Sequence, residues 1–466
     1  MADMQKQQRL VLVIAILASF VSFLDGSVVN VALPAIDREL GGGLATQQWV
    51  VDAYLITLGA LILVAGSLSD VFGRISVLRW GLAGFGVTSL LCALAPTAGF
   101  LIVSRGLQGI AGALLVPSSL AIIMSSFRGQ AQAKAIGWWT GWTFAAFLIG
   151  PLVGGLFVDL VSWRLVFAIN VLPIAATLGL LVALMRIDRS LARRPSGASV
   201  DYLGAVLCVL GLGGPVYALI EQGSQGWGSP AIYLPFVLGV LAFAAFLWRQ
   251  ATAAAPMMPL RLFRVRNFGM GNIATTAIYG ALAIGNLLVV VFLQQVAGYP
   301  ATAAGLALLP VTIVSAALSS VFGTLAGRVG PRLFMTAGPI VAGAGFLLLL
   351  RAGADADYWS EVLPGVLVFG LGLATTVAPL TTAILGSIDP AQSGIGSAIN
   401  NAVSRVAGLI TVALLGVIVG TRIDVAGFHR GLVVTAALLV LGGVISAFGI
   451  SNRAVKAAEA TGSAGR

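Results

Sequence analysis

The sequence predicts an all-α integral membrane protein with fourteen membrane-spanning helices. The 466-residue chain is 59% hydrophobic and only 9% charged, whereas a soluble domain carries about 25% charged residues. Apolar stretches of about 20 residues, the length that crosses the core of a bilayer, recur from one end of the chain to the other. Because lipid offers no hydrogen-bond partners to the backbone, we expect each stretch to be a helix.

Hydropathy places the ends of each element. The predicted spans are residues 10–31, 47–68, 77–96, 100–125, 134–157, 164–185, 202–221, 231–249, 268–293, 303–326, 333–350, 361–387, 399–420 and 431–450. The 59 glycines suit this class, because small residues let membrane helices pack closely. An even number of spans places both termini on the same side of the membrane.

The Lys and Arg residues predict which side that is. If the N-terminus is cytoplasmic, 19 of the 26 basic residues fall in cytoplasmic segments and five in outer segments, while Arg105 and Arg405 fall within spans. This asymmetry follows the positive-inside rule. We therefore predict a multi-pass protein of the plasma membrane with both termini in the cytoplasm. The net charge of +10 then reflects topology and contact with anionic lipids, and no nucleic-acid partner is expected.

Two basic, proline-containing stretches, 186–199 and 249–266, divide the spans into groups of six, two and six. The predicted domains are an N-terminal six-helix bundle at 1–190, a linker with two extra transmembrane helices at 191–262, a C-terminal six-helix bundle at 263–455 and a cytoplasmic tail at 456–466. A weak repeat relates the bundles, because Gly66–Arg74 after span 2 resembles Gly323–Gly330, 257 residues later. Repeated halves are common in secondary transporters.

Four ionisable residues lie inside predicted spans: Asp25, Asp52, Arg105 and Arg405. A charge there costs several kcal/mol and is a functional hypothesis by default. At about 1.5 Å per residue, the first three lie about 8–9 Å below the outer ends of spans 1, 2 and 4, and so share one level of the first bundle. We interpret them as a proton and cation site, because burial disfavours a charged carboxylate whereas a nearby arginine favours it.

A plainer interpretation remains for each group. Arg105 and one aspartate would form a static buried pair that fixes helix packing. Arg405, in the inner half of span 13, would either extend to the cytoplasmic interface or meet an anionic group of the substrate or a lipid. Further residues are predicted to line a substrate cavity: Asn30, Tyr54, Gln108, Trp142, Asn286, Asn401 and Arg405. Most aromatic residues near span ends are expected to anchor the helices at the interface.

The chain lacks the residues that several classes of function require. It has one histidine and two cysteines, Cys92 and Cys208, both inside apolar spans, so no metal site and no disulfide is expected. No Walker-type glycine loop suggests ATP as an energy source. No nucleophile–base arrangement suggests an enzyme. We therefore predict no cofactor, with a proton gradient as the energy source.

Four motifs lie in the expected spans and order: LDGSVVNVALP at 24–34, GSLSDVFGRISVL at 66–78, LIVSRGLQGIAGALLVP at 101–117 and GWTFAAFLIGPLVGG at 141–155. They are similar to the span 1 signature, the loop motif between spans 2 and 3, the span 4 motif and the span 5 antiporter motif of one family. The chain resembles the major facilitator superfamily, in its fourteen-span drug:proton antiporter branch. The resemblance covers nearly the whole chain.

This resemblance implies the major facilitator fold, with two six-helix bundles and two extra transmembrane helices between them. It implies proton-coupled efflux of hydrophobic small molecules, cationic ones included, such as drugs or antibiotics, by alternating access. Export of a lipid or of an endogenous metabolite or antibiotic is the alternative, and a membrane enzyme or transport-inactive sensor is a more distant one. The expected partners are the small-molecule substrate, protons and membrane lipids, and the monomer is expected to function alone.

The resemblance also assigns gating roles to two groups of residues. The first group lies in the loop after span 2, and the simpler interpretation is that this loop is an ordinary solvated turn. The second group lies at the end of span 5, and the simpler interpretation is ordinary helix packing. The residues concerned are Gly66, Asp70, Gly73 and Arg74 in the loop, and Gly150, Pro151, Gly154 and Gly155 in span 5. It further supports Asp25 as the proton carrier.

Overall fold

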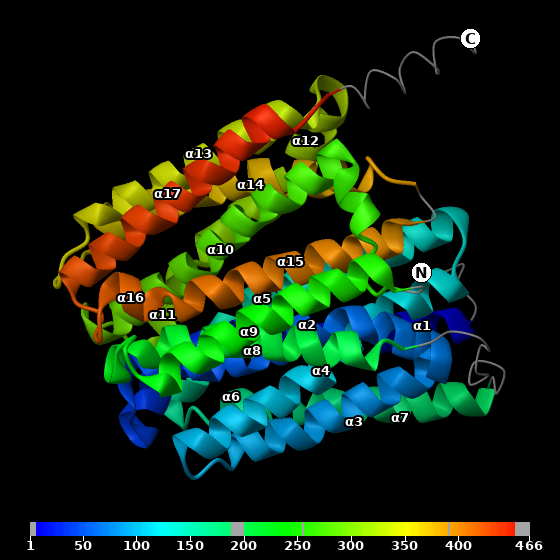
Figure 1. Ribbon diagram of the computed structural model, residues 1–466, viewed down its shortest axis with the longest axis horizontal. Coiled ribbons are helices and arrows are strands. Elements are labelled where there is room, and N and C mark those ends of the chain that lie inside the picture. The colour runs from blue at the N-terminus through cyan, green and yellow to red at the C-terminus, as the bar shows by residue number, and fades with distance from the viewer. Residues whose placement is uncertain (1–5, 188–199, 254–255, 390–391, 453–466) are drawn as a thin grey trace. The chain divides into compact units, whose positions relative to one another are not determined.

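The computed structural model of the protein describes residues 6–187, 200–253, 256–389 and 392–452. Within these ranges, fourteen helical segments are long and apolar enough to cross a membrane (Figure 1). The predicted all-helical membrane fold with fourteen spans is therefore confirmed. The predicted tail at 456–466 and most of the basic stretch at 186–199 lie outside the described residues.

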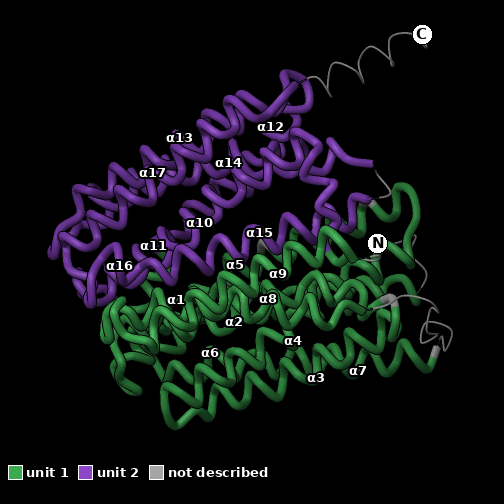
Figure 2. Tube along the Cα trace, in the orientation of Figure 1, with its two compact units in different colours: residues 1–257, 300–306 green, residues 258–299, 307–466 purple. Residues whose placement is uncertain are grey.

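The chain forms two compact units (Figure 2). Unit 1 comprises residues 1–257 and 300–306, and unit 2 comprises residues 258–299 and 307–466. The helices of the predicted linker, α8 (Tyr202–Gln225) and α9 (Pro230–Thr252), thus belong to unit 1, where α8 packs against α2. The predicted functional boundaries at residues 190 and 262 stay predictions.

Unit 1 is organised around α1 and α4. Besides α8 and α9, its helices are α1 (Lys6–Leu40), α2 (Gly43–Phe72), α3 (Arg74–Ala93), α4 (Ala98–Ser126), α5 (Gly129–Leu160), α6 (Leu165–Ala168) and α7 (Val171–Ile187). Helix α1 packs against α4 and α5, α2 packs against α4, and α3 packs against α4 and α7. Apolar side chains such as Ile14, Leu58, Phe85 and Leu181 fill the space between them.

Unit 2 contains the remaining spans. Its elements are η2 (Leu260–Arg264), α10 (Arg266–Gln295), α11 (Ala301–Ala307), α12 (Leu309–Val329), α13 (Pro331–Leu348), η3 (Leu349–Arg351), η4 (Tyr358–Val362), α14 (Leu363–Leu385), α15 (Ser393–Ala413), α16 (Leu415–Val419) and α17 (Val425–Gly449), with most of α11 assigned to unit 1. Helix α10 packs against α15 and α17, and α14 packs against α12 and α13.

Three predicted spans are interrupted. Span 13 is divided into α15 and α16 at Leu414 with no proline nearby, whereas the other two breaks each precede a proline. Span 6 is divided into α6 and α7 at Asn170, three residues before Pro173, and span 10 into α11 and α12 at Leu308, two residues before Pro310. Proline has no N–H to donate to the carbonyl four residues earlier, which weakens the helix at each of these two positions, although Pro151 and other prolines lie inside continuous helices. The break in span 6 places the Asn170 side chain in the middle of unit 1.

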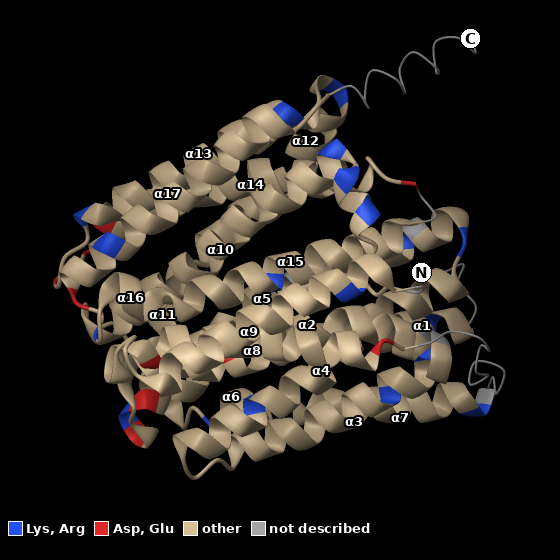
Figure 3. Ribbon diagram, in the orientation of Figure 1, with Lys and Arg blue, Asp and Glu red and all other residues tan. Residues whose placement is uncertain are grey.

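Charged residues gather near the helix ends of each unit, and the middles of most helices carry none (Figure 3). This is the arrangement that lipid demands, because a charge in the hydrocarbon costs several kcal/mol. The same residues are the basis of the predicted orientation, which stays a prediction. Arg105 and Arg405 are the basic residues that the sequence places inside spans, at α4 and α15.

The sequence repeat corresponds to a repeated turn. Gly73 ends α2 with a φ of 87°, and Gly330 ends α12 with a φ of 101°, and in each case the next residue begins a new helix. Residues with a side chain rarely adopt these angles, whereas glycine adopts them at little cost. The related segments therefore form the same tight helix-to-helix connection in the two units.

The two extra helices are fastened together by Asp201 at the start of α8. Its carboxylate accepts hydrogen bonds from Gly204 N–H at 2.9 Å, Arg249 Nε at 2.6 Å and Gln250 Nε2 at 3.1 Å. Burial by itself raises the pKa of Asp201, but these donors outweigh it and hold the pKa below its ordinary value. The carboxylate caps α8 and also joins it to the end of α9.

We expect Asp201→Ala to lower the thermal unfolding midpoint near neutral pH, because it removes a helix cap worth about 1 kcal/mol and an ion pair. Since the folded pKa lies below the unfolded value of about 3.9, the Asp201 contribution is complete above that value and is lost as the pH falls through the folded pKa. The difference between parent and variant, measured by thermal unfolding in detergent at several pH values, should therefore narrow in acid. A constant difference at every pH would contradict this account.

Candidate functional site

Asp25 of α1 and Arg105 of α4 form an ion pair deep in unit 1. Arg105 Nη1 lies 2.7 Å from Asp25 Oδ2, and both side chains are almost fully buried, with 2% and 0% of their surface exposed. Two ions are stable away from water only when their geometry is good and other hydrogen bonds satisfy their remaining polar atoms. The surroundings of the pair meet that condition.

Amide side chains complete the coordination of Asp25. Gln108 Nε2 donates to Asp25 Oδ1 at 3.0 Å, and Asn170 Nδ2 donates to the same oxygen at 2.9 Å. Gln108 also donates to Ser89 Oγ at 2.9 Å and accepts from Arg105 at 2.6 Å. The sequence analysis did not identify Asn170 or Ser89. An asparagine in an apolar span just before a proline was the available signal for Asn170.

Arg105 is held from a third side by α2. Its Nε donates to the carbonyl of Val50 at 3.0 Å, and its guanidinium lies over the Tyr54 ring at 4.3 Å. Tyr54 and Gln108, which were predicted to line a substrate cavity, are thus buried against the ion pair. The resulting network connects α1, α2, α3 and α4 with the break in span 6.

Asp52 of α2 stands outside this network. Its side chain is fully buried, and neither carboxylate oxygen has a hydrogen-bond partner among the described residues. Near this level, Val50, Tyr54 and Thr57 of α2 contact α4. Asp52 lies on a different face of the helix from these three residues. Of the three charges that the sequence predicted at one level, the structure therefore pairs Asp25 with Arg105 and leaves Asp52 apart from them.

The residues predicted to form a gate after span 2 have varied surroundings. Arg74 Nη1 donates to the carbonyl of Ala121 on α4 at 3.1 Å, so it supports the end of the bundle. Gly73 provides the turn described above, and a methyl group at Gly66 would meet no atom within 4 Å. The side chain of Asp70 lies outside what the structure describes. The gating role stays a prediction.

The span 5 motif brings backbones close together inside unit 1. A methyl group added at Gly150 would lie 2.0 Å from Ser27 Oγ, and one at Gly154 would lie 2.5 Å from Val28 Cγ2, both on α1. One at Gly155 would lie 2.4 Å from Thr302 Cα. Such distances are far below van der Waals contact, so α5 can approach its neighbours only because these positions are glycines. Pro151, between them, lies inside the helix.

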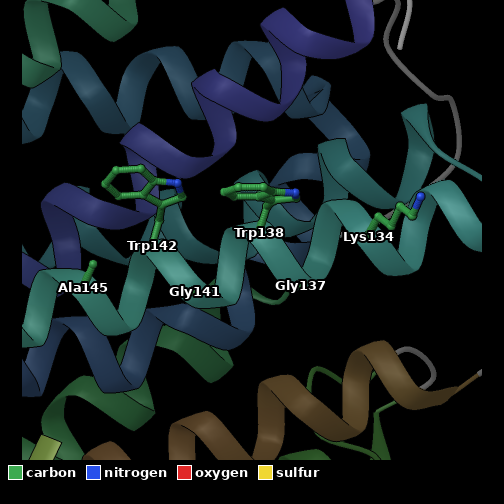
Figure 4. Close-up of a pocket in the computed structure, with 6 residues that line it drawn as sticks. All are labelled: Lys134, Gly137, Trp138, Gly141, Trp142 and Ala145. Atoms are coloured by element: carbon green, nitrogen blue, oxygen red, sulfur yellow. The ribbon is translucent and has the colours of Figure 1, made fainter. Parts of the chain in front are cut away.

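A cavity of about 520 Å³ lies along one face of α5 (Figure 4). Trp138 and Trp142, one helical turn apart, project into it side by side, each about half exposed. Trp142 also packs edge-on against Phe20 of α1, with ring centroids 6.5 Å apart. The other lining residues are Lys134, Gly137, Gly141 and Ala145. The cavity is open on one side, and its described lining comes from α5 alone and is mostly apolar.

The other residues predicted to line a cavity are placed as follows. Asn30 on α1 is half-buried. Asn286 on α10, and Asn401 and Arg405 on α15, are half-buried in unit 2. In that unit Asn400 donates hydrogen bonds to Asn272 Oδ1 and Thr275 Oγ1 of α10, at 3.1 and 3.0 Å, so part of its polar surface fastens α15 to α10.

Fourteen membrane-spanning helices, with an ion pair buried inside one unit, define a multi-pass membrane protein. A family model described as "Major Facilitator Superfamily" matches residues 15–412, and the chain belongs to that family. The resemblance stated from its motifs is therefore confirmed.

The chain is similar to proteins named for resistance and export. It is 35% identical over 416 residues to the methylenomycin A resistance protein of Bacillus subtilis (strain 168), which covers 88% of this chain and 87% of that protein. It is 33% identical over 405 residues to the tetracenomycin C resistance and export protein of Streptomyces glaucescens, covering 86% and 74%. The crystal structure of peptide transporter POT in complex with sulfate has a TM-score of 0.70 at 16% identity, covering 94% of this chain and 93% of that one, which shows a shared fold.

We expect Asp25→Asn to lower the unfolding midpoint strongly, because it leaves the Arg105 guanidinium buried without its counter-charge. Breaking a buried pair from one side costs about 3–5 kcal/mol. The double variant Asp25→Asn with Arg105→Gln should recover much of the loss, since no unpaired charge remains. Thermal unfolding of the purified variants measures both effects. A single variant as stable as the parent would show that the pair does not hold the bundle.

Gly155→Ala should destabilise the protein and abolish transport, since the new methyl group would meet the backbone at Thr302. Gly179→Ala on α7 is the matched control, because a methyl group there meets no atom within 4 Å. In a helix interior the same change by itself favours folding by about 0.5–1 kcal/mol. Expression, thermal stability and transport of the two variants are compared. Equal stability and transport in the two variants would contradict the steric role that we assign to Gly155.

Proposed function

We propose that the protein exports hydrophobic small molecules across the plasma membrane in exchange for protons, by alternating access. Two observations support this. Similar proteins are named for resistance to methylenomycin A and for resistance to and export of tetracenomycin C. The span 5 segment that resembles the antiporter motif makes the close helix contacts described above. No cofactor beyond the proton gradient is needed.

The observation that carries proton coupling is the contrast between the two buried aspartates. Asp25 has an arginine and two amide donors, so both of its oxygens have hydrogen-bond partners. Asp52 is equally buried, and the described residues give it no hydrogen bond. An unpaired carboxylate away from water is stable only in its neutral form. We therefore assign the transported proton to Asp52, with the Asp25–Arg105 pair as the fixed framework beside it.

The α5 cavity is the proposed substrate contact. Trp138 and Trp142 offer two indole faces, which bind flat apolar groups through their large contact area. The small residues of this lining, Gly137, Gly141 and Ala145, leave room for such a group. Lys134 is the charged residue of this lining and lies near the start of α5. Substrate breadth follows naturally from such a lining, because it contains few directional polar groups.

The energy of one proton is sufficient for this task. A charge that moves through 100 mV gains about 2.3 kcal/mol. Since about 1.4 kcal/mol corresponds to a tenfold change in concentration ratio, one proton per cycle supports more than tenfold accumulation of a neutral substrate. A cycle in which Asp52 loads from one side and unloads to the other therefore needs no further energy source.

We expect Asp52→Asn to abolish transport driven by a pH gradient and substrate-induced proton release, because the amide cannot exchange a proton. Exchange of substrate without a gradient should persist, since the α5 cavity is unchanged. Purified protein in vesicles is tested with a broad panel of apolar compounds that includes antibiotics and lipid analogues. Asp355→Asn, at an exposed loop position, is the matched control and should behave like the parent.

Three results would contradict the proposal. Proton-coupled transport by the Asp52→Asn variant would show that Asp52 does not carry the transported proton. Loss of coupling in a fully folded Asp25→Asn, with Asp52→Asn unaffected, would transfer the role to Asp25. A parent protein that shows neither uptake nor proton release with any compound would end the antiport assignment. Transport of lipid analogues alone would establish the alternative substrate class.

A further inference from the structure

A second cavity, of about 460 Å³, lies at the end of unit 1 where α2 begins. Its walls come from three helices: Thr46 and Trp49 from the first turns of α2, Ile102 from α4, and Glu221 and Ser224 from the last turns of α8. The charge distribution of the sequence predicts that this end faces the outside. The cavity is separate from the α5 cavity, and it has no role in the proposed proton cycle.

The charge of this cavity comes from Glu221. Trp49 Nε1 donates to Glu221 Oε1 at 2.8 Å. The second carboxylate oxygen receives a long hydrogen bond of 3.5 Å from Ser224 Oγ, and the described residues give it no other. Carboxylate oxygens can accept several strong hydrogen bonds. Glu221 therefore keeps acceptor capacity at the wall of a cavity that contains no basic lining residue.

The indole of Trp49 is fixed beside this carboxylate. Its ring packs against Tyr217 of α8 with centroids 6.0 Å apart, and its N–H is committed to Glu221. The face of an aromatic ring attracts cations, and tryptophan attracts them most strongly. A rigid indole next to a carboxylate fits an ammonium group that carries apolar substituents, since the acid neutralises the charge and the ring contacts the methyl or methylene groups.

The surroundings favour a cation over an anion. The nearest arginine of α4, Arg105, lies one turn beyond Ile102, and it is paired with Asp25 and bonded to Val50. An anionic ligand would meet Glu221 without any compensating base, and burying it there would be costly.

We propose that this cavity is a binding site for an organic ammonium group, with Glu221 as the counter-ion and Trp49 as the aromatic wall. The ammonium group belongs either to a free amine compound or to the headgroup of an aminophospholipid, because both present the same chemistry at a membrane surface. The site gives the extra helix α8 a role in ligand binding as well as in packing. It stands independently of the proposed proton coupling.

The simpler account is that the bond between Trp49 and Glu221 only fastens α8 to α2. Glu221→Gln separates the two accounts, because glutamine keeps the carbonyl oxygen that accepts from the indole but removes the charge. A purely structural contact should tolerate this change. An ammonium site should lose its ligand.

The experiment uses the full-length protein with Ser224→Cys as a reporter in the cavity wall. The two native cysteines, Cys92 and Cys208, are buried, so N-ethylmaleimide should label position 224 first. The parent protein, which lacks a cysteine at position 224, is the control and should be labelled slowly. In phosphatidylglycerol nanodiscs, phenyltrimethylammonium should slow labelling at least fivefold. The neutral isostere tert-butylbenzene should not slow it, and in the Glu221→Gln background neither compound should protect. Ala45→Cys on the opposite wall is a second reporter if the first variant folds poorly.

Nanodiscs that contain phosphatidylethanolamine distinguish the two sources of the ammonium group. Glu221-dependent protection by this lipid alone assigns the site to a headgroup. Protection only by added phenyltrimethylammonium assigns it to a free amine. The proposal is overturned by no protection from either source, by equal protection in Glu221→Gln, or by equal protection from the neutral isostere. None of these readouts involves transport, so failure of the antiport proposal would leave them unaffected.

Discussion

Every other feature of this structure depends on the rule that backbone polar groups in lipid must be satisfied within their own segment. The rule forces each span to be a helix and restricts where a helix can be interrupted. The described chain breaks spans 6, 10 and 13, and the breaks at Asn170 and Leu308 lie just before a proline that removes a backbone donor. The break in span 6 is used, because its asparagine binds Asp25 in the interior. The interruption of the helix thus supplies the Asn170 amide to the network around Asp25.

The interior of unit 1 treats its two aspartates in opposite ways. Asp25 has a counter-ion and two amide donors, so that five segments of the bundle meet around one fixed charge. Such a group keeps its place in the bundle, since each of these donors holds one of its two oxygens. Asp52 lacks these donors. Burial without such donors favours the neutral form of this side chain, which is the property that the proposed proton exchange uses.

The sequence predicted the fold well, because hydropathy, charge asymmetry and span length all act along the chain. It also predicted that Asp25, Asp52 and Arg105 lie at similar depth. It did not predict which of them touch, since depth fixes the position along a helix axis but not the direction of a side chain. Asn170 and Ser89 were missed for a related reason, because a single polar residue in an apolar span looks the same whether it faces a neighbour or a cavity. The contact between Trp49 of α2 and Glu221 of α8 depends on tertiary packing, so no local sequence pattern predicts it.

The end of span 5 shows how steric and polar contacts act together in unit 1. Asp159 accepts hydrogen bonds from Ala301 N–H at 2.9 Å and from Thr302 N–H at 2.8 Å, two backbone donors that the start of α11 cannot satisfy itself. Gly155 and Gly305 allow the contact, because a methyl group at either would lie within 2.6 Å of backbone atoms on the other helix. The chain leaves unit 1 between residues 306 and 307, immediately before the break at Leu308. The first turns of span 10 therefore lie against α5 within unit 1, and Gly155 and Gly305 leave room for that contact.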